Sequence, residues 1–215
     1  MTAASPVGRL FFWLICSVFL ASVASAGSID TSLLEQAWPK QRVKEYEIDK
    51  YPVRWRQAVK CKGEEIFAGA SFTAPAAHET VWNMAADYTD LGTMTPGVEH
   101  VQFLEDTPTR QVIQIDMKVL WKTLRLAFEI EREPPTVARF RMTNDLVGEY
   151  RGFCRMRPEG GQTQVELATW LRPAVRVPAG LILWVERAVM LKGIRGFLEA
   201  CERAAPPATG TPSAT

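Results

Sequence analysis

Hydrophobic and polar residues alternate along most of the middle of the chain. The alternation is cleanest in residues 110–121 and 123–133, where every second side chain is apolar and most of those between are charged or polar. Period-two alternation is typical of strands whose sheet buries one face. Similar segments, separated by turns rich in Pro and Gly, follow the same rule at 65–74, 98–106, 136–144, 149–157 and 164–173. The pattern predicts a half-buried antiparallel sheet.

Two segments change from period two to the helical period. Residues 76–88 follow Pro75 and place Val81, Trp82 and Ala85 on one side of a predicted helix. The second helix begins after Pro178 and runs over 179–203. A stripe along this second helix is predicted to face the sheet, and it consists of Leu181, Trp184, Ala188, Leu191, Leu198 and Cys201.

The order of these elements favours one architecture. A strongly bent sheet cannot cover its own concave face, and only the helix 179–203 is long enough to lie across it. The sequence therefore predicts an α+β helix-grip fold, in which a curved antiparallel sheet wraps around a long C-terminal helix. In that arrangement a ligand would lie between the helix and the sheet.

The chain ends differ from this core. Residues 1–26 contain one charge, Arg9, then an apolar run ending in Ala24-Ser25-Ala26, a pattern that a signal peptidase accepts. We predict a signal peptide that is cleaved after Ala26 and export to the periplasm; the alternative is an uncleaved membrane anchor. We predict that the rest of the chain consists of an N-terminal extension at 27–63, the helix-grip domain at 64–203 and a disordered Pro/Ala/Thr-rich tail at 204–215.

Charge and candidate chemistry exclude several functions. Without Arg9 the chain has 24 basic and 24 acidic residues, so no net field favours nucleic acid. His78 and His100 are predicted to be exposed, and they are too few for a metal cluster. The three remaining cysteines, Cys61, Cys154 and Cys201, allow one disulfide at most, and buried inert thiols are the simpler interpretation. We predict no catalytic residue, metal or cofactor. Asp116 and Glu129 point away from the core by strand parity.

The segments "ASFTAPAAHETVWNMAADYTDLGTMTPGVEHVQFLED", "GEYRGFCRMRP" and "GGQTQVELATWLRP", followed by an amphipathic helix, resemble the START-like (SRPBCC) superfamily. That group includes polyketide cyclases and dehydrases, coenzyme-Q-binding proteins, lipid transfer proteins and the Bet v 1 allergens. The resemblance covers roughly residues 64–203. It implies a cavity for a hydrophobic small molecule, and it leaves carriers and enzymes both open.

The inward faces of the predicted strands are almost wholly apolar, with Tyr150 and Thr169 as the main polar exceptions. We therefore expect a binding protein for a lipid or other hydrophobic molecule. The predicted ligand-binding residues are Ile115, Met117, Trp121, Leu126, Phe128, Phe140, Met142, Tyr150, Leu181, Trp184 and Ala188. The apolar start of the last helix predicts a transient membrane contact as well. The alternatives are a cyclase- or dehydratase-like enzyme that uses Tyr150, and a filled domain that binds a partner through its charged segment 40–63.

Overall fold

The computed structural model describes residues 28–204, except 62–63, 87, 89–94, 96, 120–121 and 145–146. The predicted signal peptide lies outside the described residues, and so does the tail apart from Ala204. Within the described part, no helix combines the length and the apolar character needed to cross a bilayer.

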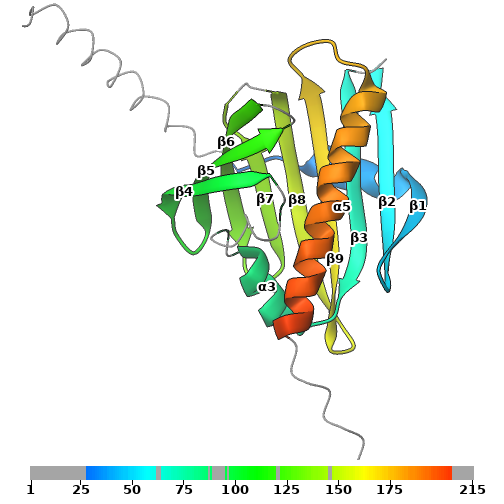
Figure 1. Ribbon diagram of the computed structural model, residues 1–215, viewed down its shortest axis with the longest axis vertical. Helices are drawn as coiled ribbons and strands as arrows, with labels where there is room; N and C mark the ends of the chain where they lie inside the picture. Colours follow the sequence, from blue (N-terminus) through cyan, green and yellow to red (C-terminus); the bar gives the residue numbers. More distant parts are fainter. Residues whose placement is uncertain are drawn as a thin grey trace, which may run out of the picture.

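One antiparallel sheet of nine strands organises the fold (Figure 1). Its spatial order is β1-β2-β3-β9-β8-β7-β6-β5-β4. After β3 the chain crosses to β4 at the far edge of the sheet and then adds one strand after another, until β9 pairs with β3. The strands are β1 (Arg42–Ile48), β2 (Tyr51–Lys60), β3 (Glu65–Ala74), β4 (Val98–Asp106), β5 (Arg110–Val119), β6 (Lys122–Glu133), β7 (Val137–Met142), β8 (Gly148–Glu159) and β9 (Gln162–Pro173). The strands predicted from alternation are all present.

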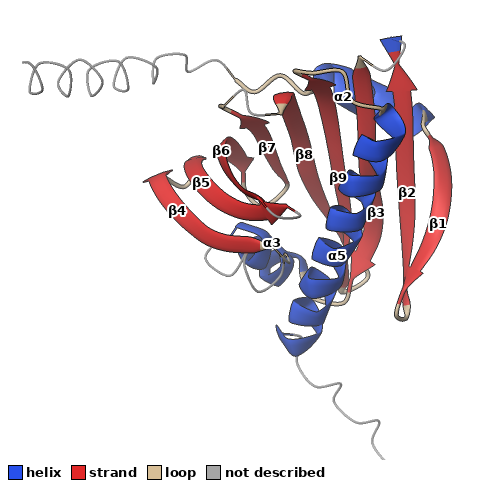
Figure 2. Cartoon of the chain, turned by 45° about the horizontal axis from the view of Figure 1, so that its top comes forward, coloured by secondary structure: helices blue, strands red, loops and turns tan. Residues whose placement is uncertain are grey.

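Two helices occupy the concave face of this sheet (Figure 2). The long helix α5 (Ala179–Ala204) runs across β3 and β9, and the shorter α3 (His78–Ala86) lies beside its C-terminal end. Val81 and Trp82 of α3 are buried, as their predicted shared face requires. A curved sheet wrapped around a long C-terminal helix confirms the predicted α+β helix-grip fold.

The small side chains of β3 bring α5 close to the sheet. Ala68 and Ala70 are fully buried in an apolar cluster with Ile194 and Leu198 of α5. Because neither alanine projects beyond its Cβ, the helix can approach the strand without a gap. This contact holds the C-terminal half of α5 on the β3 side of the sheet.

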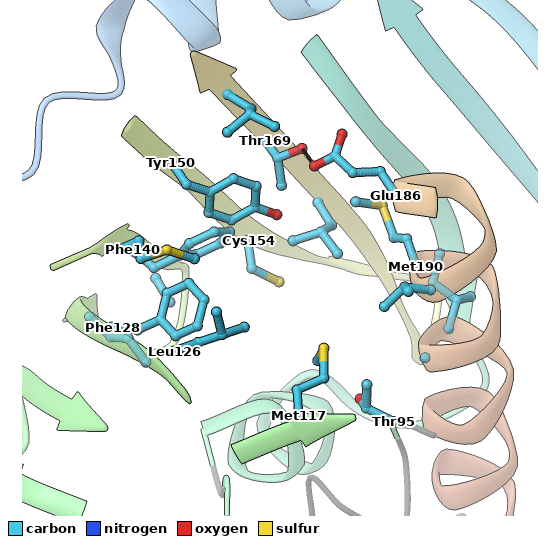
Figure 3. A pocket seen from close by; sticks show the side chains of 18 of the residues that line it. Thr95, Met117, Leu126, Phe128, Phe140, Tyr150, Cys154, Thr169, Glu186 and Met190 are labelled. Carbon is cyan, nitrogen blue, oxygen red and sulfur yellow. Dashed lines mark hydrogen bonds between the residues drawn. The ribbon is translucent and has the colours of Figure 1, made fainter. Parts of the chain in front are cut away.

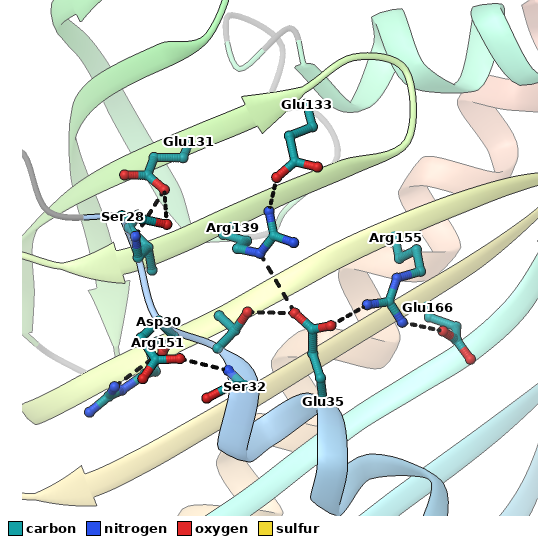
Figure 4. Close-up of polar contacts among 12 residues, drawn as sticks. Ser28, Asp30, Ser32, Glu35, Glu131, Glu133, Arg139, Arg151, Arg155 and Glu166 are labelled. Atoms are coloured by element: carbon teal, nitrogen blue, oxygen red, sulfur yellow. Dashed lines mark hydrogen bonds and ion pairs between the residues drawn. The ribbon is translucent and has the colours of Figure 1, made fainter.

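The opposite, convex face is covered by the N-terminal segment that follows residue 27. It contains the helix α2 (Ser32–Ala37) and the 3-10 turn η1 (Trp38–Lys40), and both lie behind the sheet in Figures 1 and 2. Trp38 is 3% exposed and packs over Gly69, at which a Cβ atom would overlap the Trp38 ring. Glu35 forms ion pairs with Arg139 and Arg155 on the same face (Figure 4).

The predicted extension 27–63 contributes two strands of the sheet. β1 pairs with β2 along its whole length, and β2 pairs with β3. The predicted boundary between 63 and 64 therefore falls between neighbouring strands of one continuous sheet. The charged segment 40–63, considered above as a partner surface, contains β1 and β2, and these two strands form this edge of the sheet.

The face of α5 that meets the concave side differs from the predicted stripe. Leu198 and Cys201 are buried as predicted, but Trp184 is 57% exposed. Of the predicted residues in the first half of α5, Leu181 does line the cavity. The other lining side chains of this half are neighbours of the predicted ones, and successive residues of a helix point about 100° apart. They are Ile182, Val185, Glu186, Val189 and Met190. The predicted stripe was wrong at Trp184 and Ala188 because this half is apolar on several sides, so periodicity did not define a single stripe.

Candidate functional site

A cavity of about 750 Å³ lies between the sheet and α5. Its walls come from β5 to β9 on one side and from α5 on the other, with Trp82, Met84 and Ala85 of α3 at one end. Cavities of this size are typical of small-molecule binding sites. The fold therefore leaves the space between helix and sheet partly unfilled.

The cavity exists because α5 leans on one half of the sheet only. It packs against β3, while β5, β6 and β7 curve away from it on the far side (Figure 2). Strand alternation then points apolar side chains of those strands into the space. On β6 these are Leu124, Leu126, Phe128 and Ile130.

Three aromatic rings from neighbouring strands form one wall of the cavity (Figure 3). The ring centroids of Phe128, Phe140 and Tyr150 are 6.2 to 6.5 Å apart. Gly152 on β8 makes room for this wall, since a Cβ atom there would overlap the Phe140 ring. These distances are those of favourable aromatic contacts, so the wall is pre-formed.

The described lining includes a polar cluster between α5 and the strands β8 and β9. Glu186 of α5 points toward Thr169 of β9 and toward Tyr150 of β8 (Figure 3). The Oγ1 atom of Thr169 lies 3.1 Å from Oε1 of Glu186 and 3.1 Å from the carbonyl oxygen of Ala68. Oε2 of Glu186 is buried and has no hydrogen-bond partner among the described residues.

The apolar surroundings shift the protonation of these groups. Burial raises the pKa of Glu186 to about 7, although hydrogen bonds from Thr169 and Tyr150 act in the opposite direction. Burial, and then the charge of Glu186, raise the pKa of Tyr150 above its ordinary value. Burial raises the pKa of the Cys154 thiol to about 12, so this cavity cysteine is not a thiolate at neutral pH.

Most of the predicted ligand-binding residues come together at this cavity. Its lining contains Met117, Leu126, Phe128, Phe140, Met142, Tyr150 and Leu181. Ile115 is buried beside the lining, in a cluster with Ile113 and Ile130. Trp184 and Ala188 lie on other sides of α5, outside the lining. Trp121 lies outside the described residues.

Glu186 was missed by the sequence analysis. It lies in the apolar half of α5, within "LILWVERAVML", and only Arg187 accompanies it as a charge. An acidic residue in a helix segment that is apolar on several sides is the signal that could have identified it. Its partner Thr169 was recognised as an inward polar residue.

The histidines and cysteines are dispersed. His100 is exposed as predicted, while His78 is half-buried. The cysteines 61, 154 and 201 are free, and the exposed Cys61 corrects the expectation that each thiol is buried. Among the described residues, no three His, Cys, Asp or Glu side chains are grouped so that they could hold a metal ion.

The fold and the cavity define a START-like helix-grip protein with an internal hydrophobic site. A family profile described as polyketide cyclase / dehydrase and lipid transport matches residues 68–205, so the chain belongs to that family. No curated protein sequence matches the chain significantly.

Solved structures of similar fold come from both branches of the family. The Zhui aromatase/cyclase from Streptomyces sp. R1128 shares 20% identity over 68% of this chain and 99% of its own, with a TM-score of 0.58. A STAR-related lipid transfer protein from Xanthomonas axonopodis shares 14% identity over 75% and 98%, with a TM-score of 0.64. Human STARD10 shares 10% identity over 85% of this chain and 83% of its own, with a TM-score of 0.64. At these identities the likeness concerns the fold alone.

Proposed function

We propose that the protein binds a lipid or another hydrophobic small molecule in the cavity between the sheet and α5. The observation that carries this proposal is the cavity itself, about 750 Å³ in volume and lined mainly by aliphatic, aromatic and methionine side chains. An apolar ligand gains roughly 25 cal/mol for each Å² of apolar surface that it buries, before the costs of association. Flexible methionines such as Met117 and Met190 suit such a wall to ligands of varied shape.

Two glycines of α5 provide a matched test of this site. Gly193 lines the cavity, and a Cβ atom there meets nothing closer than Oγ1 of Thr95 at 3.6 Å. Gly180 lies in the first turn, outside the lining, with nothing within 4 Å. Both gain helix propensity when replaced by leucine, by about 1 kcal/mol in a helix interior.

We expect Gly193→Leu to fill part of the cavity and to weaken binding of the neutral fluorescent probe N-phenyl-1-naphthylamine at least tenfold, while Gly180→Leu leaves binding unchanged. Fluorescence titration measures both, and thermal unfolding checks that the variants fold. Equal probe binding by the two variants would place the site elsewhere. Native mass spectrometry and solvent extraction of protein purified from its own host should recover the natural ligand unchanged.

We further propose that the start of α5 touches a membrane while the ligand enters or leaves. Leu181 lines the cavity and is 52% exposed, and the neighbouring Trp184 is 57% exposed. Large apolar side chains exposed beside a ligand cavity are typical of such contacts. Replacing Leu181 and Trp184 by glutamine should slow uptake of a pyrene-labelled fatty alcohol from phosphatidylcholine vesicles. It should leave thermal stability unaltered. Unchanged uptake would contradict this contact.

Export belongs to the same proposal, because Ala24-Ser25-Ala26 has the pattern of a signal-peptidase site. Protein recovered from the host envelope should begin at Gly27. A chain that keeps its N-terminal methionine and stays with the membrane fraction would favour the uncleaved anchor instead.

A second candidate function is an enzyme of the cyclase or dehydratase type. The observation that favours it is the carboxyl group of Glu186, whose pKa of about 7 suits proton transfer at neutral pH. Tyr150 would hydrogen-bond a substrate oxygen beside it. Turnover of an added poly-β-ketone substrate that Glu186→Gln and Tyr150→Phe both abolish would establish this function. Recovery of an unchanged ligand would favour the carrier.

A further inference from the structure

The described lining of the cavity carries two charged side chains, Glu186 and Arg132. They belong to different regions. Glu186 is grouped with Tyr150 and Thr169, whereas the charge of Arg132 acts on Tyr88, which is close enough to Cys154 to be influenced by it as well. Tyr150 and Cys154 are four residues apart on β8, which corresponds to about 13 Å along a strand. An amphiphile in the cavity therefore has two different places for a polar head.

The contacts of Thr169 specify how Glu186 is held. Its hydroxyl oxygen lies 3.1 Å from two acceptors, the carbonyl oxygen of Ala68 and Oε1 of Glu186. A hydroxyl has one proton and can donate to only one of them. When it donates to the backbone, the second contact is a hydrogen bond only if Glu186 carries a proton and donates to Thr169. The geometry thus accommodates a neutral carboxyl group, in agreement with its raised pKa.

The second oxygen of Glu186 remains unused. Oε2 is buried and has no hydrogen-bond partner among the described residues, which is an unfavourable condition for a buried polar group. The terminal torsion of a glutamate side chain is broad, so the carboxyl plane can turn at little cost. A ligand head that reaches Glu186 can therefore satisfy an oxygen atom that the protein leaves without a partner.

We propose that the ligand of this cavity is a long-chain alcohol, and that its hydroxyl group hydrogen-bonds to Glu186 beside Tyr150 and Thr169. Its apolar body then lies against Phe128 and Phe140. This inference rests on the proposed function, because it assumes that the cavity binds a hydrophobic molecule, and it adds the chemical class of the head group.

A hydroxyl group fits this site better than a charged head does. It donates to an ionised carboxylate and accepts from a protonated carboxyl group, so it binds Glu186 on both sides of pH 7. An ammonium group pairs only with the ionised form and brings a second charge out of water. A fatty acid carboxylate is repelled by ionised Glu186, and Arg132 in the other region of the cavity is already paired with Asp106.

The test compares ligands that share one chain and differ in their heads: 1-dodecanol, its methyl ether, dodecylamine and dodecanoate. Each displaces N-phenyl-1-naphthylamine from the full mature chain in a fluorescence titration. We expect 1-dodecanol to bind at least tenfold more tightly than the ether, the amine and the carboxylate. Glu186→Leu should abolish the preference of alcohol over ether, while Glu186→Gln retains most of it because an amide also donates and accepts.

Glu199→Leu is the control, since it removes an exposed carboxylate from the same helix, outside the cavity lining. It should leave the preference intact. Equal binding of alcohol and ether by the native chain overturns the proposal, even if Glu186→Leu fails to fold. The proposal is also overturned if dodecylamine binds most tightly of the four ligands. The same holds if dodecanoate binds most tightly and Arg132→Leu abolishes that binding. Failure of all four ligands and of the probe to bind would instead refute the proposed function.

Discussion

The two faces of the sheet arise from the same alternating sequence pattern, but one face is packed solid and the other borders a cavity. On the convex face, Trp38 and Leu34 fill the space against Phe67, Phe153 and Trp170. On the concave face, large apolar side chains of β5 to β8 surround an open cavity. The difference comes from the covering element. The N-terminal segment lies directly on the convex face, whereas α5 packs mainly on β3 and leaves β5, β6 and β7 on the far side uncovered.

Charges are also treated differently on the two faces. On the convex face Glu129 is only 4% exposed, yet it pairs with Arg110 and with Arg141. Strand parity correctly predicts that Glu129 points away from the cavity. Glu35 pairs with arginines of β7 and β8 (Figure 4). On the concave face Glu186 has Thr169 and Tyr150 as its neighbours, and both are uncharged. A filled face can hold ion pairs, whereas a binding face retains an uncompensated carboxyl group.

The largest expected difference between the faces concerns their aromatic anchors. Trp38→Ala should lower the free energy of unfolding by about 3–5 kcal/mol, because it opens a hole in a filled layer. Phe140→Ala should cost about 2 kcal/mol, since its half-buried ring already borders open space. Urea unfolding monitored by circular dichroism measures both values.

Probe binding separates the two effects further. Below its unfolding transition Trp38→Ala should bind N-phenyl-1-naphthylamine as the native chain does, while Phe140→Ala should alter the affinity. Equal losses of stability, or a loss of binding in Trp38→Ala, would mean that the convex layer and the cavity are not independent.

The second difference is in the pH dependence of stability. Glu186 has its pKa raised in the folded state from 4.5 to about 7, so the folded state binds the proton more tightly. Stability from this group is therefore complete below pH 4.5 and is lost as pH rises through about 7. Relative to Glu186→Gln, the native chain should lose roughly 3 kcal/mol between pH 4.5 and pH 8.

Glu35 on the convex face provides the opposite sign. Burial alone would raise its pKa, but the Thr31 hydroxyl and the charges of Arg155 and Arg139 outweigh burial and lower it. Its contribution is present above its ordinary pKa and is lost as pH falls through the lowered value. The difference in stability between the native chain and Glu35→Gln should therefore become smaller as the pH falls.

The prediction for Glu186 fails if the native chain and Glu186→Gln lose stability in parallel from pH 4.5 to pH 8, because the pKa of Glu186 would then not be raised.

The sequence predicts the faces of the strands much better than the face of α5. In a strand, neighbouring side chains point to opposite sides, so alternation assigns Phe128 and Glu129 without knowledge of what covers them. Helix α5 is apolar on several sides in its first half, and its orientation depends on contacts with β3 that are distant in sequence. Trp184 was therefore placed on the ligand side and Glu186 was overlooked. The cover of the convex face by Trp38 likewise depends on a distant glycine.

The smallest expected difference concerns the two glycines that make room for rings. Gly69 on β3 accommodates Trp38 on the convex face, and Gly152 on β8 accommodates Phe140 on the concave face. An added methyl group at either position would also overlap a backbone oxygen of β9, at Leu167 or Ala168. That part of the cost is shared, and overpacking of this kind is worth about 1–3 kcal/mol.

What differs is the freedom of the displaced ring. Phe140 can move toward the cavity, whereas Trp38 is enclosed between its own segment and the sheet. Gly69→Ala should therefore destabilise the protein by about 1 kcal/mol more than Gly152→Ala in thermal unfolding. Gly152→Ala should in turn weaken probe binding, because the ring takes up space that the ligand needs. If Gly152→Ala proves the more destabilising, then the wall formed by Phe128, Phe140 and Tyr150 is as rigid as the filled layer behind it.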